Sequence, residues 1–158
     1  MTSLQDLIDE RAIREALAHF ARILDRKQWG RLHEVFAEDL TYDYGDGQDR
    51  RGIDSLREHI RRFLDVCGNT QHLIGSVLVE VDGNQAISHS YVQARHQGRA
   101  EQSVLFFDAN GEYIDHWERR AQGWRIARRE AIWQMHMGDP SVLSASAESL
   151  QSDAPGTL

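Results

Sequence analysis

Cysteine is almost absent from the sequence, since Cys67 is the only one in 158 residues. No disulfide can form within the chain, and a cysteine-ligated zinc site lacks its ligands. Long apolar runs are missing as well: no stretch approaches the roughly 20 apolar residues of a membrane-spanning helix, and the N-terminus lacks the basic and apolar segments of a secretory signal. We therefore expect a soluble, cytoplasmic protein with no membrane partner.

Positive charge is also scarce. Lys27 is the only lysine, and 18 basic residues stand against 25 acidic ones, which gives a formal net charge of −7. Binding to a phosphate backbone requires a basic face, and local pairs such as Arg50-Arg51 do not reverse the acidic surplus. The charge balance therefore argues against nucleic acid as a partner.

The length and composition are those of one globular domain. Hydrophobic residues make up 41% of the chain and charged residues 27%, both close to globular averages. We expect a folded domain over residues 1–138. Residues 139–158 are mostly small and polar, so we expect a C-terminal tail that is mobile or caps a neighbouring surface.

Helical periodicity dominates the first part of the sequence. Over residues 3–24 apolar side chains recur at three- and four-residue steps, with Ser3 placed as N-cap and Asp6 three residues further on. A shorter helix is expected over residues 27–36 and a third over residues 54–66. Each of these helices has an apolar side that must pack against another layer.

Strand patterns dominate the rest of the sequence. A short strand is expected over residues 40–44, and longer ones over residues 70–81, 86–96, 103–119 and 124–137. Glycine-containing connections between them suit hairpin turns, and Asn110-Gly111 inside the third long run suits a turn or a bulge. Helices followed by a meander predict an α+β fold, with the helices on one face of an antiparallel sheet.

No local catalytic motif is present, so candidate residues are chosen by their placement. Asp25 closes the first helix beside its apolar stripe. A carboxylate at a helix C-terminus opposes the helix dipole, which favours a nearby cationic or protonatable partner. The alternative is a solvated carboxylate paired with Arg22 or Arg26.

His72 is the histidine best placed for general-base chemistry. Alternation puts it on one strand face with Ile74, Ser76 and Leu78, and an imidazole in an apolar pocket can take a proton near neutral pH. The alternative is a hydrogen-bonded core histidine. The opposite strand face is apolar as well, which suggests either a closed-up, twisted sheet or an oligomer that buries the outer surface.

The last strand offers a third candidate, because Arg129 shares one face with Ala131 and Trp133 and could belong to a cavity wall. No pairing of histidines with acidic residues has the spacing of metal ligands, so no metal site is predicted. The other histidines are weaker candidates because of their polar or charged neighbours or their late position in strands: His19, His33, His59, His89, His96, His116 and His136.

Three features together resemble the SnoaL-like group of the nuclear transport factor-like cone fold: the aspartate ending the first helix, Gln71-His72 opening a strand, and the closing Gly123-Trp124-Arg125-Ile126 strand. The resemblance covers residues 4–137 and is closest in pattern to the hexachlorocyclohexane dehydrochlorinases and scytalone dehydratases. It implies a curved sheet wrapped around the N-terminal helices to form a cone with an interior pocket. It also implies a lyase without cofactors, a small-molecule substrate and a homo-oligomer, with a trimer favoured.

The resemblance also implies roles for particular residues. In the dehydrochlorinases an Asp–His pair removes the proton and an arginine assists the departing anion, and the matching positions are Asp25, His72 and Arg129. A lysine of those enzymes is replaced here by Phe20, which removes a cation from the pocket and points to a different substrate. The pocket walls implied by the resemblance are Phe20, Tyr42, Val92, Tyr113, Asp115, Ala131 and Trp133.

An aromatic lining of this kind suits a flat, hydrophobic substrate. The sequence thus predicts a cofactor-independent lyase that eliminates water after proton abstraction by an Asp–His pair. Two alternatives remain open. An isomerase or polyketide-type cyclase in the same pocket would give Asp115 the larger role. A non-catalytic protein similar to the small subunit of a dioxygenase would need a partner and no working pocket.

Overall fold

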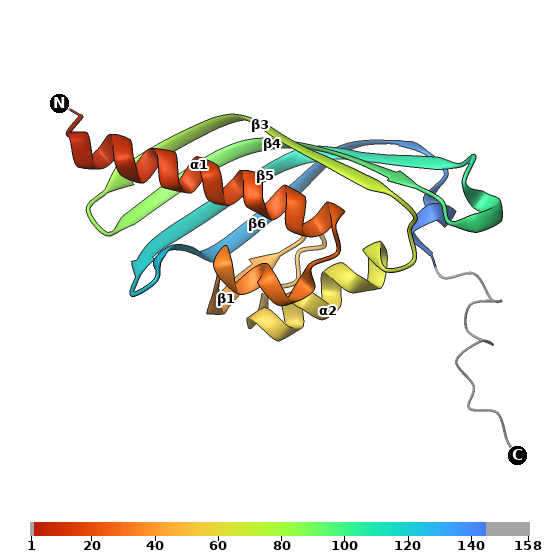
Figure 1. Cartoon of the computed structure of the whole chain (residues 1–158), viewed down its shortest axis with the longest axis horizontal. Coiled ribbons are helices and arrows are strands. Elements are labelled where there is room, and N and C mark those ends of the chain that lie inside the picture. Colours follow the sequence, from red (N-terminus) through yellow and green to blue (C-terminus); the bar gives the residue numbers. More distant parts are fainter. Residues whose placement is uncertain (1, 145–158) are drawn as a thin grey trace, which may run out of the picture.

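The computed structural model describes residues 2–144 and shows a curved sheet with helices on one side (Figure 1). The helices are α1 (Leu4–Asp25) and α2 (Ile53–Leu64), with short 3₁₀ helices η1 (Trp29–Glu34), η2 (Ala100–Gln102) and η3 (Pro140–Leu143). The strands are β1 (Phe36–Asp43), β2 (Arg50–Arg51), β3 (Thr70–Asp82), β4 (Gln85–Gln97), β5 (Phe106–Arg120) and β6 (Gly123–Gly138). The α+β class and the helix-covered, curved sheet are confirmed.

The six strands form one sheet in the order β2-β1-β6-β5-β4-β3. Strands β3 to β6 form the predicted antiparallel meander. Strand β1, however, pairs with β6 in the parallel direction, so the expectation of a wholly antiparallel sheet is wrong at this edge. The two strands are far apart in the sequence, and no tight turn dictates their relative direction.

Helix α1 lies across β3 and ends at the start of that strand (Figure 1). A capping box begins it: the Asp6 backbone N–H donates to the Ser3 hydroxyl, and the Ser3 N–H donates to the Asp6 carboxylate. From Ile13 onward its apolar stripe is buried against the sheet, whereas Leu4, Leu7 and Ile8 in the first turns are more than half exposed. This packing sets the last residue of the helix, Asp25, beside the first residues of β3.

A bulge in β3 changes which side chains of that strand face the core, from even-numbered positions before it to odd-numbered positions after it. The register with β4 shifts between Gly75 and Leu78, and Ser76 has a φ of 48°. His72, before the bulge, is buried, whereas beyond it the odd-numbered valines from Val77 onward pack against the core and Leu78 is 69% exposed. The predicted placement of Ser76 and Leu78 on the His72 face is therefore wrong, because one extra residue reverses the inward set.

Several element boundaries also differ from the prediction. The second helix is only the six-residue η1, and β1 begins at Phe36 rather than at residue 40. Strand β5 begins at Phe106 rather than at residue 103, because η2 at residues 100–102 and the turn that follows it come before the strand. The Asn110-Gly111 pair continues β5 and makes no turn; it lies opposite a bulge in β6, where Gln134 is the extra residue between the partners Trp133 and Met135.

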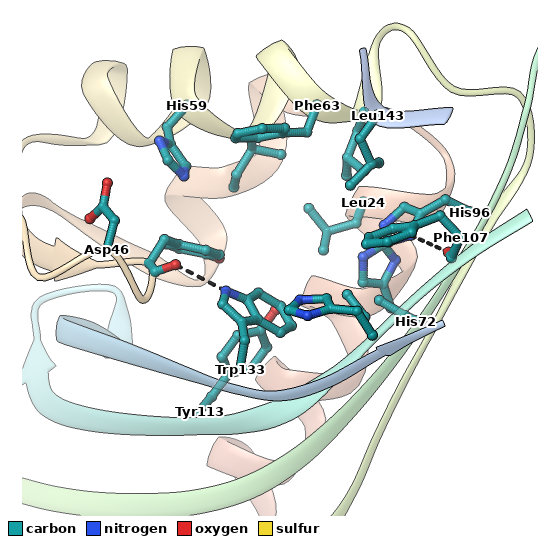
Figure 2. A pocket seen from close by; sticks show the side chains of 16 residues that line it. Leu24, Asp46, His59, Phe63, His72, His96, Phe107, Tyr113, Trp133 and Leu143 are labelled. Carbon is teal, nitrogen blue, oxygen red and sulfur yellow. Dashed lines mark hydrogen bonds between the residues drawn. The ribbon is translucent and has the colours of Figure 1, made fainter. Parts of the chain in front are cut away.

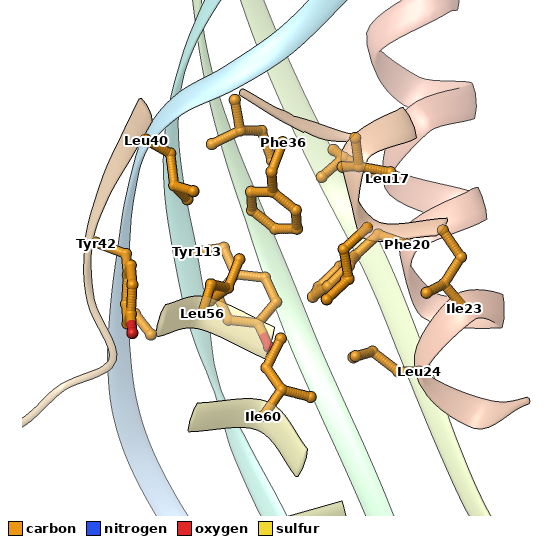
Figure 3. Close-up of a cluster of buried hydrophobic side chains, with 14 of the residues drawn as sticks. Leu17, Phe20, Ile23, Leu24, Phe36, Leu40, Tyr42, Leu56, Ile60 and Tyr113 are labelled. Atoms are coloured by element: carbon orange, nitrogen blue, oxygen red, sulfur yellow. The ribbon is translucent and has the colours of Figure 1, made fainter. Parts of the chain in front are cut away.

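The main core fills the space between α1, α2 and the sheet. Figure 3 shows Leu17 and Phe20 of α1 and Leu56 of α2 facing Phe36 and Leu40 of β1. All five side chains are at most 1% exposed. Burial of each such side chain contributes about 1.5–3 kcal/mol, so apolar packing holds both helices on the sheet.

An ion pair with a buried carboxylate fastens the first half of α1 to the β5–β6 hairpin. Arg119 donates two hydrogen bonds to the Asp9 carboxylate, at 2.6 and 3.0 Å, and the Trp124 indole N–H donates a third at 3.0 Å. Asp9 is only 3% exposed. These bonds fix how far along the sheet α1 lies, and hence where its C-terminal residue ends.

The first residues of the predicted tail pack against the domain. Asp139 caps η3 by accepting a hydrogen bond from the Ser141 N–H, and Val142 is buried. Residues 145–158, the remainder of the predicted tail, lie outside the described residues. Within residues 2–144 no helix is both long and apolar enough to cross a membrane.

Candidate active site

A cavity of about 260 Å³ lies between the C-terminal end of α1, α2 and strands β3 to β6. Figure 2 shows His72 and His96 on one side of it, His59 and Asp46 on the other, and Trp133 between them. Most of the remaining lining is aliphatic or aromatic. Four histidines line the cavity: His59, His72, His96 and His136.

Asp25 and His72 form a hydrogen-bonded pair at the cavity wall. His72 Nδ1 lies 2.7 Å from Asp25 Oδ1. Asp25 also accepts hydrogen bonds from the Thr70 hydroxyl at 3.0 Å and from the His72 backbone N–H at 3.1 Å. Because an ionised carboxylate only accepts, Nδ1 carries the imidazole proton and Nε2 keeps its lone pair. The structure thus brings together two predicted residues in the arrangement of an oriented base.

His96 is a second imidazole beside this pair. Its Nδ1 lies 2.9 Å from the Phe107 carbonyl oxygen, which can only accept, so His96 Nε2 is left as an acceptor. Its ring meets the His72 ring edge to face, with centroids 5.6 Å apart. Burial lowers the pKa of His96, although the Phe107 carbonyl opposes the shift, and this keeps the ring neutral at neutral pH.

Two tyrosines supply hydrogen-bond donors at the cavity. Arg129 Nη1 donates to the Tyr44 hydroxyl at 3.5 Å, and since a guanidinium has only donors, Tyr44 keeps its own proton for another acceptor. Burial raises the pKa of both Tyr44 and Tyr113, while the Arg129 charge opposes the rise. Both hydroxyls therefore remain protonated, and the Tyr44 hydroxyl can donate to a carbonyl oxygen.

Arg129 itself lies behind the cavity wall. Its guanidinium donates to both oxygens of Asp115, at 2.7 and 2.8 Å, and both side chains are fully buried. Burial alone would lower the pKa of Arg129, but Asp115 outweighs that effect and raises it, so the arginine stays charged. The rings of Tyr113, Phe20 and Phe36 cover the guanidinium, with centroids 4.0, 4.4 and 5.0 Å from Cζ. Arg129 is fully buried and does not line the cavity, where the sequence predicted that it would meet the leaving group.

Of the other predicted pocket residues, Tyr113 and Trp133 line the cavity. Tyr42 is fully buried, and its hydroxyl lies 2.7 Å from the Ser55 hydroxyl. Strand alternation predicts which face a side chain is on but not how deep in the cone it lies, and the deeper positions are filled by α1 and α2. The predicted residues placed in this packed interior are Phe20, Tyr42, Val92, Asp115 and Ala131.

Sequence reasoning missed several lining residues, namely Tyr44, His59, His96 and His136. A signal was available for two of them. His96 is four residues after Val92 on β4 and so shares its inward face, and His59 is next to Ile60 on the apolar side of α2. Charged sequence neighbours concealed both.

Among residues 2–144, no three histidine, cysteine or acidic side chains converge in a way that could hold a metal ion. The ionisable side chains that line the cavity are four imidazoles, two phenols and the Asp46 carboxylate.

Comparison with known proteins identifies relatives of this chain. A family model described as a SnoaL-like domain matches residues 5–130. An uncharacterized protein of Mycobacterium tuberculosis is 31% identical over 135 residues, covering 82% of this chain and 88% of that protein. A scytalone dehydratase of Aspergillus fumigatus is 28% identical over 131 residues, covering 75% of this chain and 78% of that enzyme.

A solved structure with a similar fold is also found. The crystal structure of a hexachlorocyclohexane dehydrochlorinase from Novosphingobium barchaimii is similar with a TM-score of 0.75 and 14% identity, covering 92% of this chain and 99% of that one. At such low identity the likeness shows the fold alone. Because the family model spans most of the described residues, the chain belongs to the SnoaL-like domain family.

Proposed function

We propose that the protein is a cofactor-independent lyase of the dehydratase type, in which the Asp25–His72 pair removes a proton from carbon and water is eliminated. The observation that carries this proposal is the 2.7 Å contact between His72 Nδ1 and Asp25 Oδ1 at the wall of a largely apolar cavity. The aromatic lining favours a small, hydrophobic, aromatic substrate. The similarity to a scytalone dehydratase supports the same class of reaction.

In the first step His72 Nε2 takes the proton, and the C–H electron pair is released into the substrate. The imidazolium that forms remains hydrogen-bonded to the Asp25 carboxylate, which stabilises its positive charge. His72 side-chain atoms are only 5% exposed, so bulk water competes little for the base. Electrostatic stabilisation is stronger in such a water-poor site than in solution.

In the second step the bond between carbon and the leaving hydroxyl breaks as the carbon–carbon double bond forms. The His72 imidazolium returns its proton to the departing oxygen, which leaves as water, and the base is regenerated. His96 Nε2 is an acceptor on the same side of the cavity and can hold the hydrogen of that hydroxyl. No outside acid or oxidant is required.

A carbonyl group next to the reacting carbon would make the proton more acidic. The Tyr44 hydroxyl can donate to such a carbonyl and stabilise the enolate that develops. Arg129 takes part indirectly, because its contact with Tyr44 orients the Tyr44 proton. The arginine therefore acts in this scheme as a positioning residue rather than a catalytic one.

Two observations count against the alternatives. Asp115, the base expected for an isomerase or cyclase, has both oxygens bound by Arg129 and is fully buried. A non-catalytic subunit has no need for a hydrogen-bonded Asp25–His72 pair facing an open cavity. Elimination by His72 is the reaction that the arrangement favours.

A proton-exchange experiment tests the base whatever the leaving group is. Aromatic β-hydroxyketones are incubated with the protein in deuterium oxide, and NMR follows exchange of the α-proton and appearance of the enone. We expect wild-type protein to catalyse both, His72→Ala to lose both, and Asp25→Asn to lose most of the rate. The control is His116→Ala, which removes an exposed imidazole from the outside of β5. Full turnover in His72→Ala would refute the proposal.

We also propose a homo-oligomer, with a trimer as the expected form. A shallow groove on the outer face of the sheet is lined in part by Leu73, Tyr91 and Met135, which are 56%, 55% and 62% exposed. Apolar side chains clustered in this way favour association. Light scattering after gel filtration should give three times the mass of one chain, and Tyr91→Lys should lower it. A wild-type protein that elutes as a monomer would contradict this part of the proposal.

A further inference from the structure

His59 and His136 are the two cavity histidines that the proposed reaction does not use, and His59 is the more buried of them. It comes from α2, whose buried residues Leu56, Ile60 and Leu64 pack into the core. His59 and Phe63 lie beside that stripe and line the cavity. Figure 2 shows His59 on the opposite side of the cavity from His72 and His96, with Trp133 between the two sides.

Aromatic rings hold the His59 imidazole in place. Its ring centroid lies 5.3 Å from that of Tyr44, 5.4 Å from that of Phe63 and 5.9 Å from that of Tyr42. Contacts with rings on both α2 and β1 restrict the ring to a narrow range of orientations. The imidazole is therefore positioned before any ligand arrives, which lowers the entropic cost of binding through it.

The nitrogens of His59 differ from those of the other cavity histidines in their bonding. His72 and His96 each commit Nδ1 to a partner in the protein. Within the part of the chain that the structure describes, no side chain or backbone group forms a hydrogen bond with the His59 imidazole, whose backbone belongs to α2. The side chain is half-buried and its ring nitrogens are not sealed from solvent, so water or a ligand can reach them.

The charges around His59 determine which kind of ligand it suits. Burial is the main cause that lowers the pKa of His59; Arg50 and Arg62 lower it further, and Asp46 opposes them. The ring is thus neutral at neutral pH and offers one N–H donor and one acceptor nitrogen. A hydroxyl group, which also has one donor hydrogen and acceptor lone pairs, matches this pattern better than a carboxylate or an ammonium group does.

We propose that His59 is a specificity-determining residue, which hydrogen-bonds a hydroxyl group on the end of the substrate remote from the bond that breaks. The cavity then selects a molecule with polar groups at both ends and an apolar, aromatic middle. This inference rests on the proposed function for the identity of the reacting end. The binding contact itself can be measured without turnover.

Calorimetric titration of indan-1-one and its ring-hydroxylated isomers provides the test, because these ketones differ only in the presence and place of one hydroxyl. We expect at least one isomer to bind wild-type protein about 3- to 10-fold more tightly than indan-1-one, as one added hydrogen bond allows. In His59→Phe, which keeps an aromatic ring but has no polar atom, that preference should fall to about 1-fold while affinity for indan-1-one is retained.

A matched control removes a different imidazole from the same cavity. His136 lines the cavity and stacks on Phe107, with centroids 5.6 Å apart. His136→Phe should therefore keep the preference for the hydroxylated isomer. NMR adds a direct readout: the imidazole nitrogen shifts of His59, assigned by their absence in His59→Phe, should move with the hydroxylated isomer and not with the parent ketone.

Two results would overturn the inference: wild-type protein that binds no hydroxylated isomer more tightly than indan-1-one, or a preference that survives in His59→Phe. Failure of the proposed function gives a different result. Asp25→Asn that retains turnover would refute the role of the Asp25–His72 pair, whereas loss of the hydroxyl preference in His59→Phe would still establish the His59 contact.

Discussion

The buried pair of Arg129 and Asp115 allows a quantitative test of how the site is built. Asp115→Asn preserves the shape of the side chain but removes the negative charge that compensates the guanidinium. Both side chains are fully buried, and two hydrogen bonds of 2.7 and 2.8 Å join them. The variant therefore leaves a buried cation without its counterion.

The expected cost follows from that geometry. Breaking a buried ion pair by removing one partner costs about 3–5 kcal/mol. Three aromatic rings within 5.0 Å of the Arg129 Cζ retain part of the stabilisation of its charge, which favours the lower end of that range. For a domain of this size each kcal/mol lowers Tm by about 2–4 °C, so a loss of about 3 kcal/mol predicts a fall of about 6–12 °C.

A double variant separates the effect of charge from the effect of position. Asp115→Leu combined with Arg129→Met removes both charges, and we expect it to recover most of the lost stability, as replacement of buried ion pairs by apolar residues often does. Turnover should stay reduced, because the contact between Arg129 and Tyr44 is gone. Thermal denaturation followed by circular dichroism and the enone assay measure the two quantities independently.

Two outcomes would refute this reasoning. A fall in Tm of less than about 2 °C for Asp115→Asn would mean that the guanidinium is not held in a low-dielectric interior. A double variant with full turnover would mean that Arg129 has no part in orienting the Tyr44 hydroxyl.

Further predictions concern Tyr42 of β1, Tyr44 in the turn after β1, and the ion pair between Asp9 and Arg119. Tyr42→Phe should cost about 1 kcal/mol in urea unfolding, from loss of the contact with Ser55, and leave turnover intact. Tyr44→Phe should lower kcat about 100-fold with little change in stability, because it removes a donor to the substrate. Hydrogen bonds from Arg119 are the main cause that lowers the pKa of Asp9, so this stabilisation is present above the unfolded pKa of about 4 and is lost as pH falls through the folded value. Tm should therefore drop on acidification from about pH 5. Asp9→Asn should have a lower Tm at neutral pH but a shallower drop in Tm on acidification. An unchanged dependence of Tm on pH in that variant would contradict the role given to the Asp9 carboxylate.

Local patterns were sufficient for much of the fold. The apolar stripe and capping box of α1 predicted its ends to within one residue, and glycine-containing turns located the hairpins of the meander. The position of Asp25 at a helix end and of His72 at a strand start indicated both members of the pair. Their separation in the sequence, however, carried no information about a 2.7 Å contact.

Errors arose where distant segments decide the geometry. The bulge at Ser76 reverses the inward set of β3, and no residue pattern there separates a bulged strand from a regular one. The parallel pairing of β1 with β6 likewise depends on how the helices cover the sheet. Arg129 shares the inward face as predicted, but the rings that cover its guanidinium come from α1, β1 and β5, and it does not reach the cavity.

The sequence by itself determined the absence of an intrachain disulfide and the acidic charge balance, because both depend on composition alone. The order of helical and strand patterns determined the class of fold, and the placement of Asp25 and His72 together with the family resemblance indicated the candidate base. Only the tertiary structure decided which inward side chains reach the cavity. Depth in a cone is set by the packing of α1 and α2 against the curved sheet, and this packing buries Arg129, Asp115 and Tyr42 while leaving Tyr44, His59 and His96 at the cavity wall.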